Sequence, residues 1–376
     1  MRSSMRIPAM LAAATLAVLT TSTPATAARP ELRINQIQTM ATHNSYHREL
    51  TDAEKDVQRR TDKNWWNLQY SHTALPNQFT SQHVRGIELD VLPDPQGGLY
   101  TQPLVRRDAG LPALTDPDLA KPGNKVLHWP DHDYGSNCVT LVKCLTQVRE
   151  WSDAHPGHLP ITILTELKRT DPAKEAMGGA KSPLWDGPLL DALDAEIRSV
   201  FPDERLIRPD DVRRPGLTLE QSVLRYGWPA LEPSRGKVMF FMDNQGADVQ
   251  APYLAGRPNL EGRVLFTNSR PGRPDAAFVG WNDPTPEIAD MVRKGYYVRT
   301  RSDVPFVEAR SGDTTRLNAA LASGAQMVST DFPVIGLSAR QGSEYVAELP
   351  GGAVGRCNPV NAPRSCRDDR ITREHR

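Results

Sequence analysis

Four apolar, strand-like runs of this sequence end in side chains of the kinds that bind divalent cations and transfer protons. In chain order these side chains are His43 and Asn44, Glu88 and Asp90, His128, and Glu166 and Lys168. Residues two apart on a strand point to the same side, so Glu88 and Asp90 can approach one ion together. Burying three carboxylates in one place is costly unless a cation holds them, and carboxylate oxygens suit Ca²⁺ or Mg²⁺.

Two histidines, His43 and His128, come from different runs and add acid–base groups to such a metal site. One imidazole can stabilise or shuttle protons at a phosphate while the other protonates a leaving oxygen. A single histidine or glutamate at the end of a strand is most often structural or solvated. A site is favoured because several successive strands end in residues that suit the same reaction. The set therefore predicts metal-assisted cleavage of a phosphodiester.

Strand-like runs alternate with amphipathic, helix-like stretches along most of the chain, for example at residues 141–153. Repeated strand–helix units predict parallel strands joined by crossovers, and the closed solution at 376 residues is an α/β fold, a distorted (β/α)8 TIM-type barrel. Three irregular inserts, 51–82, 93–124 and 170–188, are interpreted as long decorating loops on that barrel. The eight expected strands are 37–42, 86–92, 125–128, 159–167, 237–243, 263–268, 296–300 and 325–330.

The composition excludes several classes of protein. Lysine plus arginine and aspartate plus glutamate number 45 each, so net charge gives no reason to expect a nucleic-acid partner. With 39% hydrophobic residues, and Pro and Gly spread along the chain, wholesale disorder is not expected. No protein partner is evident, and a monomer is expected.

The N-terminus has the layout of a secretory signal peptide. Arg2 and Arg6 precede an apolar stretch from Ile7 to Leu19, and small residues end at Ala27. The apolar stretch is shorter than a membrane span requires. We therefore expect residues 1–27 to be removed and the protein to be secreted, with residues 28–350 as the catalytic barrel and 351–376 as a peripheral, flexible tail.

Because the protein is expected to be exported, its four cysteines are expected to form disulfides. An even number of cysteines in an oxidising compartment favours bridges over a zinc site. Of the three possible pairings, the two local ones require the least chain closure. The expected bridges are Cys138–Cys144 and Cys357–Cys366, the second of which would tie the tail.

The order of the motifs resembles the catalytic barrel of the Ca²⁺-dependent phosphoinositide-specific phospholipases C, most closely the secreted bacterial members. The resemblance extends over roughly Gln36 to Pro333. The residues that carry it are His43-Asn44-Ser45-Tyr46, Gly86-Ile87-Glu88-Leu89-Asp90, His128 and Glu166.

This resemblance implies roles for the site residues. It implies that the inositol 2-hydroxyl of a phospholipid at a membrane surface attacks the phosphorus, giving diacylglycerol and a cyclic inositol phosphate, with His43 and His128 beside the phosphate. A carboxylate such as Glu88 is a candidate base, and His128 is the acid. The implied Ca²⁺ ligands are Asn44, Glu88, Asp90 and Glu166, and the implied substrate-binding cations are Lys168, Arg299 and Arg301.

Several alternatives remain open at this point. Arg299 and Arg301 could instead form ion pairs in the barrel wall with Asp303 or Asp331, and Asp331 could orient a neighbour. His132 rivals His128 as the acid, because the segment after His128 departs from the animal enzymes, which have a glycine there. Trp65, Trp66 and Tyr70 could form an interfacial rim or pack beneath a loop.

Two other functions compete with the phospholipase C interpretation. A glycerophosphodiester phosphodiesterase or a sphingomyelinase D-like enzyme also pairs histidines with a metal held by carboxylates, although His43-Asn44-Ser45 replaces the His-Arg-Gly of the first group. A secreted lipid- or inositol-binding barrel without catalysis is the alternative from another class. Mg²⁺ is the alternative to Ca²⁺.

Overall fold

The computed structural model of the protein describes Met1 and residues 31–373. Apart from Met1, the expected signal peptide at residues 1–27 lies outside these described residues. Among the helices of the described part, none has the length and apolar character needed to cross a membrane.

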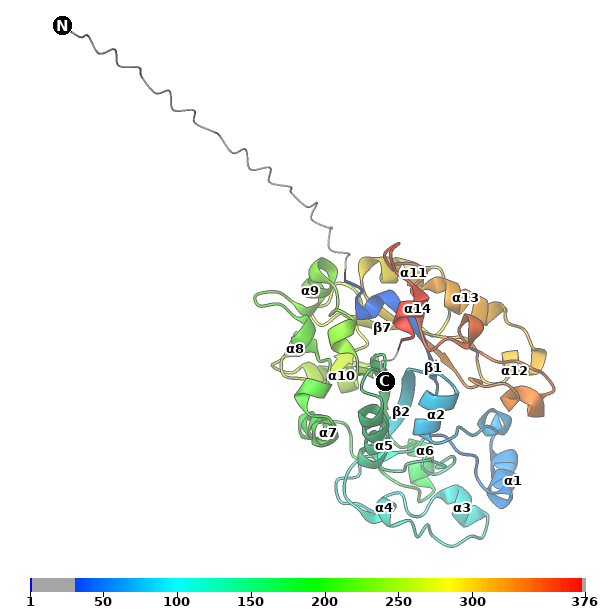
Figure 1. Cartoon of the computed structure of the whole chain (residues 1–376). Helices are drawn as coiled ribbons and strands as arrows, with labels where there is room; N and C mark the ends of the chain where they lie inside the picture. The colour runs from blue at the N-terminus through cyan, green and yellow to red at the C-terminus, as the bar shows by residue number, and fades with distance from the viewer. Residues whose placement is uncertain (2–30, 374–376) are drawn as a thin grey trace. The chain divides into compact units, whose positions relative to one another are not determined.

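Eight parallel strands form the barrel, and helices surround it (Figure 1). Neighbouring strands are hydrogen-bonded in the order β6-β5-β4-β2-β1-β9-β8-β7. A bridge between Asn268 and Phe278 joins β6 to β7 and completes the ring, so the predicted (β/α)8 fold is confirmed. The strands are β1 (Ile37–Thr42), β2 (Gly86–Leu92), β4 (Ile161–Leu167), β5 (Val238–Met242), β6 (Leu265–Thr267), β7 (Phe278–Gly280), β8 (Tyr297–Arg301) and β9 (Met327–Thr330).

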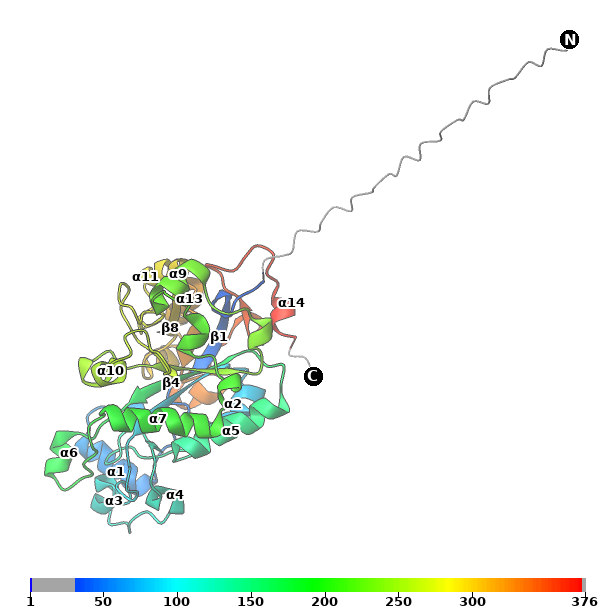
Figure 2. The same ribbon diagram turned by 90° about the vertical axis from the view of Figure 1, so that its left-hand side faces the viewer.

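The strands are buried almost throughout because side chains fill the barrel and helices cover its outside. Figure 2 shows α5 and α7 side by side along this outer layer. The helices are α1 (Asp52–Thr61), α2 (Leu75–Ser81), α3 (Leu104–Asp108), α4 (Pro117–Ala120), α5 (Leu141–Ala154), α6 (Pro172–Ala176), α7 (Gly187–Val200), α8 (Pro209–Val212), α9 (Leu219–Tyr226), α10 (Ala247–Leu254), α11 (Glu287–Lys294), α12 (Val307–Ser311), α13 (Thr315–Ser323) and α14 (Asp368–Ile371).

The expected third strand was wrong as a barrel strand. Residues 125 and 126 form β3 (Lys125–Val126), which pairs antiparallel with the end of β2 and stands outside the ring. The missing barrel strand is β7, which sequence analysis did not predict because three residues are too few to show a period. The number of barrel strands was therefore right, but one member was wrong.

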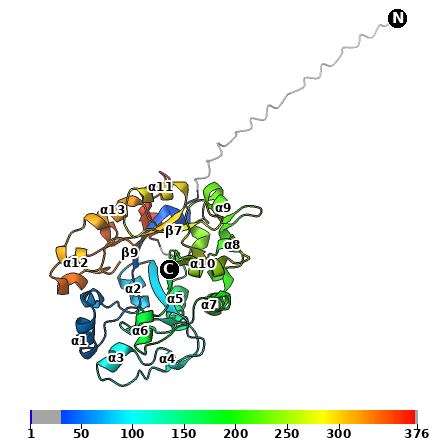
Figure 3. The same ribbon diagram turned by 180° about the vertical axis from the view of Figure 1, so that it is seen from behind.

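The three inserts expected as loops carry short helices, of which α1, α3, α4 and α6 lie near one another (Figure 3), whereas α2 lies beside α5 in the outer layer (Figure 2). The first insert contains α1 and α2, the second α3 and α4, and the third α6. Each insert follows the carboxyl end of a parallel strand, where side chains of different strands converge. The inserts therefore build the walls around the candidate site.

Gly86 allows β1 and β2 to lie close together where they meet. A Cβ atom at this position would lie 2.5 Å from Cβ of Ala41 and 2.8 Å from Oγ1 of Thr162. Ala41 is the register partner of Gly86 across the two strands. A side chain here would push β2 away from its neighbours, and Glu88 and Asp90 lie on that strand.

Both expected disulfides are confirmed, with bridges between Cys138 and Cys144 and between Cys357 and Cys366. The described part of the C-terminal segment, residues 351–373, differs from the expected peripheral tail. Its strand β10 (Arg356–Cys357) pairs antiparallel with the start of β1, and Ile371 is buried. Pairing satisfies backbone groups of β10 that a free tail would leave to water.

Candidate active site

Three carboxylates meet at the carboxyl ends of β2 and β4. The parallel register sets Asp90 directly beside Glu166, and Glu88 precedes Asp90 by two residues on the same face. One oxygen of each carboxylate lies within 4.8 Å of one oxygen of each of the others. Glu88 and Asp90 are buried, whereas Glu166 is partly exposed. The arrangement matches the predicted cluster.

Asn44 and Ser45 join the end of β1 to this cluster. Asn44 has a φ of 44°, a left-handed conformation that asparagine tolerates better than most residues, and it turns the chain immediately after His43. Ser45 then makes two hydrogen bonds to the backbone of Glu88: its N–H donates to the carbonyl at 3.0 Å, and its Oγ accepts from the N–H at 2.8 Å. These bonds hold the turn against β2.

Two cationic side chains partly neutralise the carboxylates. Lys168 Nζ lies 3.3 Å from Asp90 Oδ2 and 3.2 Å from Glu166 Oε1. The Nη2 atom of Arg299 donates to Glu88 Oε2 at 2.8 Å. Arg299 therefore pairs with a proposed metal ligand, and the expected alternative, a pair with Asp303 or Asp331, does not apply to it.

The carboxylate cluster fits a hard divalent cation. Burial raises the pKa of Glu88 to about 8, against the opposing effect of Arg299, and burial raises the pKa of Asp90 to about 6, against Lys168. Both oxygens of Asp90 are buried, and neither makes a hydrogen bond of good geometry to a described residue, although Lys168 Nζ lies 3.3 Å from Oδ2. Groups of this kind are stabilised by a cation that supplies charge and fills the empty coordination sites.

His43 is held by Asp331 at the mouth of the barrel. Its Nδ1 donates to Asp331 Oδ1 at 2.8 Å, and its Nε2 lies 3.3 Å from Arg301 and 3.7 Å from Glu88. Burial lowers the pKa of His43 well below its ordinary value, and Arg301 and Arg299 lower it further. The imidazole is therefore neutral, and Nε2 can accept a hydrogen bond from Arg301.

Arg301 contacts both His43 and Asp331, the carboxylate partner of that histidine. Its Nη2 donates to Asp331 Oδ2 at 3.1 Å, so the expected ion pair with Asp331 exists. Asp303 instead accepts hydrogen bonds from Ser302 and from the backbone of Asp331. The orienting role expected for Asp331 thus agrees with its contacts to both His43 and Arg301.

His128 reaches the site from outside the barrel wall. It follows β3, and its Nδ1 donates to Asp133 Oδ2 at 2.8 Å. His47 donates from Nε2 to the same oxygen at 2.8 Å and from Nδ1 to the carbonyl of Tyr70 at 2.9 Å. Because both partners of His47 are acceptors, its ring carries two protons. Burial alone would lower the pKa of His47, but Asp133 raises it overall.

Sequence analysis missed the roles of Asp133 and His47. It did not single out His47, whose side chain is fully buried and contacts the partner of His128. Burial would raise the pKa of Asp133, yet His47 and His128 hold it below its ordinary value, so the group stays ionised. A carboxylate five residues after a candidate histidine, in the same turn, was the signal that could have found Asp133.

A family model for Ca²⁺-dependent phosphoinositide phospholipase C matches residues 32–359 of this chain. That match covers the barrel, every expected ligand and both histidines. The chain belongs to the Ca²⁺-dependent phosphoinositide phospholipase C family. The protein is therefore an enzyme of this phospholipase C class, and Ca²⁺ is its cofactor. No curated protein matches the sequence.

Solved structures of phospholipases C share the fold. The calcium-dependent phosphoinositol-specific enzyme from Pseudomonas sp. superposes with a TM-score of 0.52 at 16% identity, over 87% of this chain and 95% of that one. Its myoinositol complex gives a TM-score of 0.52 at 17% identity, over 87% and 96%. A Ca²⁺-dependent phosphatidylinositol-specific enzyme from Streptomyces antibioticus gives 0.50 at 18%, over 80% and 95%.

Packing bears on two questions that the sequence left open for this phospholipase C. His132 lies 3.4 Å from Asp62 rather than beside Asp133, while Trp129 stacks on His128 with ring centres 4.4 Å apart. Tyr70 is buried and its hydroxyl accepts from Asn44, so it is not part of an exposed rim. Trp66 packs edge-on against Phe306 beneath Arg310 and is only partly exposed.

Proposed function

We propose that this phospholipase C is secreted and cleaves phosphatidylinositol at a membrane surface into diacylglycerol and a cyclic inositol phosphate. The observation that carries the proposal is the pairing of two histidines with two aspartates next to the carboxylate cluster. Each histidine uses Nδ1 for its aspartate and keeps Nε2 for a substrate oxygen. That arrangement suits acid–base chemistry at a phosphodiester held by a cation.

The proposed Ca²⁺ ligands are Asn44, Glu88, Asp90 and Glu166. The ion, when bound, lowers the pKa of the inositol 2-hydroxyl and offsets negative charge that develops on the phosphate. Glu88 is the proposed base that accepts the proton of this hydroxyl, since its carboxylate lies in the cluster that would hold the ion. Lys168 and Arg299 hold the neighbouring carboxylates and offer donors to inositol or phosphate oxygens.

His128 is the proposed acid. Its Nε2 would deliver a proton to the departing glycerol oxygen while the ring keeps its Nδ1–H on Asp133. An ionised aspartate behind the ring fixes its orientation and stabilises the imidazolium that carries the proton before transfer. Burial of Asp133 between two histidines keeps it in the ionised form that this role requires.

His43 and Arg301 are proposed to bind the phosphate. A phosphate placed at Nε2 adds a second anion to the one supplied by Asp331, which favours the protonated imidazole. The guanidinium of Arg301, 3.3 Å from Nε2, can turn from His43 to a phosphate oxygen without leaving Asp331. Both groups then stabilise charge in the transition state.

The decisive experiment measures release of water-soluble inositol phosphate from phosphatidylinositol vesicles. Release with Ca²⁺, none with excess chelator, and none from phosphatidylcholine vesicles is the expected result. Phosphorus NMR of the early product should show the cyclic phosphate before any ring opening. Equal cleavage of other glycerophosphodiesters would transfer the assignment to the glycerophosphodiester phosphodiesterases, and binding without release would support the non-catalytic alternative.

Secretion is supported by the two local disulfides, because such bridges persist in oxidising compartments. Its test is to express the full chain in a secreting host and determine the N-terminal sequence of the extracellular protein. We expect it to begin at Ala28. Protein that stays in the cell with Met1 intact would contradict this part of the proposal.

A further inference from the structure

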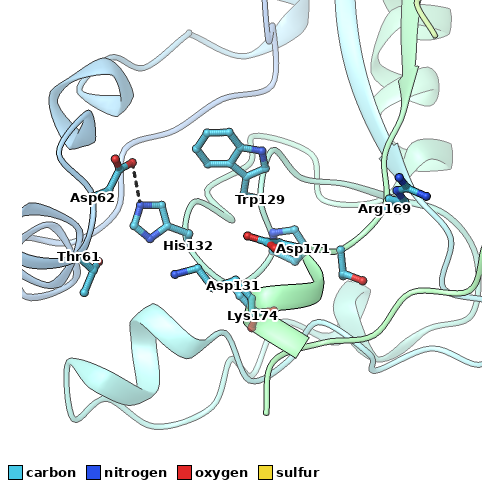
Figure 4. Close-up of a pocket in the computed structure, with 10 residues that line it drawn as sticks. Thr61, Asp62, Trp129, Asp131, His132, Arg169, Asp171 and Lys174 are labelled. Carbon is cyan, nitrogen blue, oxygen red and sulfur yellow. Dashed lines mark ion pairs between the residues drawn. The ribbon is translucent and has the colours of Figure 1, made fainter. Parts of the chain in front are cut away.

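A hollow of about 320 Å³ lies beside the candidate active site. It is called the second hollow below, to distinguish it from the space around the carboxylate cluster. Three segments from different parts of the chain form its walls: the end of α1, the turn that follows His128, and the insert that begins after β4 (Figure 4). Trp129 and Arg169 also line a larger hollow that reaches Glu166 and Lys168. The second hollow therefore adjoins the space in which the proposed substrate headgroup is bound.

Asp131 fixes the walls of this hollow. Its Oδ1 accepts the backbone N–H of Leu104 at 3.1 Å, and its Oδ2 accepts the N–H of Ala180 at 2.8 Å. One buried carboxylate thus ties the second and third inserts to the turn after His128. Because the walls are tied together without a ligand, the hollow is formed in advance of binding.

The charges around the hollow do not favour an anion. The lining includes Asp62, Asp131 and Asp171, which outnumber the cations Arg169 and Lys174. Burial lowers the pKa of His132, with Lys174 acting in the same direction, so this imidazole adds no fixed positive charge. A phosphate would face three carboxylates, and an acyl chain would desolvate five charged groups, so neither fits the lining.

The polar groups that face the hollow call for a ligand that both donates and accepts hydrogen bonds. The buried Nε2 atom of His132 lies 3.4 Å from Asp62 Oδ2, which is long for a hydrogen bond, and it makes no hydrogen bond to any other described residue. Among the described residues, Lys174 has no carboxylate in ion-pair contact, although its charge acts on Asp131 and on His132. A hydroxyl group placed here can donate to Asp62 and pair with His132, and a neighbouring hydroxyl can accept from Lys174.

Trp129 supplies a flat apolar surface next to these polar groups. The indole stacks on His128 and is still 43% exposed, which is unusual for so large an apolar side chain. Figure 4 shows it above His132, across the hollow from Lys174. A ring with hydroxyl groups at its edge and C–H bonds on its faces satisfies the indole and the polar groups together.

We propose that this hollow binds one neutral, six-membered polyhydroxylated ring, either a hexose attached to the inositol of the lipid or a free hexose. Its volume is at the small end for ligand pockets, which suits one ring. The lipid-attached form rests on the proposed function and narrows its substrate class to glycosylated phosphatidylinositol. The attached sugar must leave the 2-hydroxyl free, since that group attacks the phosphorus.

The lipid arm of the test compares phosphatidylinositol with derivatives that carry one glucosyl group on the inositol 4-, 5- or 6-hydroxyl. We expect kcat/KM to be about tenfold higher for one of these derivatives, as one well-formed polar contact allows. Lys174→Met should remove most of that preference. The matched control is Lys294→Met, an exposed lysine on α11, which should leave the preference intact.

The free-sugar arm uses methyl β-glucopyranoside and saturation-transfer NMR on the full protein. Saturation of its ring protons by the wild type, lost in Asp62→Asn and in Lys174→Met, supports the ring site. If this sugar binds but no glycosylated lipid is preferred, the ligand of the hollow is a free, soluble polyol. If a glycosylated lipid is preferred and Lys174→Met removes the preference, the ligand of the hollow is the sugar of the lipid substrate.

Two results would overturn the inference. One is the absence of both sugar binding and lipid preference. The other is loss of the sugar's saturation-transfer signal when inorganic phosphate is added, because phosphate would then occupy the hollow. Failure of the proposed function is distinguishable from both. In that case neither lipid is cleaved, while the free-sugar arm still reports directly on the hollow.

Discussion

His47 and His128 donate hydrogen bonds to the same oxygen atom, Oδ2 of Asp133, each at 2.8 Å. The two rings stand nearly perpendicular to each other, with centres 6.0 Å apart. His47 carries a second proton because its other nitrogen faces a backbone carbonyl. A buried imidazolium thus balances the charge of Asp133, and Asp133 in turn orients the proposed acid.

Asp133→Asn should therefore impair the chemical step. The amide keeps the shape of the side chain but cannot stabilise an imidazolium, so we expect kcat on phosphatidylinositol to fall by about 10²-fold to 10⁴-fold. KM should change little, because Asp133 does not contact the proposed phosphate site. A kcat within a few-fold of the wild type, in protein of unchanged thermal stability, would remove Asp133 from the mechanism.

His128→Ala should show a loss that depends on the leaving group. Cleavage of phosphatidylinositol requires protonation of glycerol oxygen, so kcat should fall by about 10²-fold to 10⁴-fold. An inositol phosphate ester of p-nitrophenol needs no such proton, and its cleavage should be reduced far less. His132→Ala is the control and should retain activity on both substrates; equal losses on both substrates in His128→Ala would exclude the acid role.

The Ca²⁺-free protein should become less stable as the pH rises. Between the ordinary pKa of 4.5 and a value of about 8 for Glu88, the folded chain holds a proton that the unfolded chain has released. The free energy of unfolding therefore falls through this window, by at most about 1.4 kcal/mol per pH unit for this group. Urea unfolding in chelator should show the fall, and Glu88→Gln should flatten it.

Added Ca²⁺ should reverse this trend. The ion binds the ionised carboxylates, so its stabilisation of the fold should grow as the pH rises from about 6 to about 8. Glu88→Gln and Asp90→Asn should each weaken Ca²⁺ affinity in a calcium titration followed by calorimetry. An affinity that neither substitution changes would exclude the carboxylate cluster as the calcium site.

Gly86→Ala tests the close packing of β1 on β2. The added methyl would lie 2.5 Å from Ala41, so we expect a loss of about 1 to 3 kcal/mol in the free energy of unfolding. Displacement of β2 should also weaken Ca²⁺ binding, because Glu88 and Asp90 lie on this strand. Ala41→Gly in the same chain removes the partner methyl and should restore part of both properties.

Local pattern was enough to predict much of this protein. Alternation placed Glu88 and Asp90 on one face of a strand, and the order of strands and helices predicted the barrel. The short separations within the two cysteine pairs predicted both bridges. These features depend on residues that are close together in the chain, and the backbone geometry fixes how such residues are placed relative to one another.

Tertiary structure decided the rest, because it depends on register and on how loops return. Register set Asp90 beside Glu166, and no local pattern contains that relationship. The reversal after residue 124 made β3 antiparallel and set the residue before His128 beside Asp90, whose carbonyl accepts the N–H of Leu127. His47 became a partner of Asp133, the carboxylate that also holds His128, only because the segment that follows β1 packs against the turn that follows His128, a contact between residues far apart in sequence.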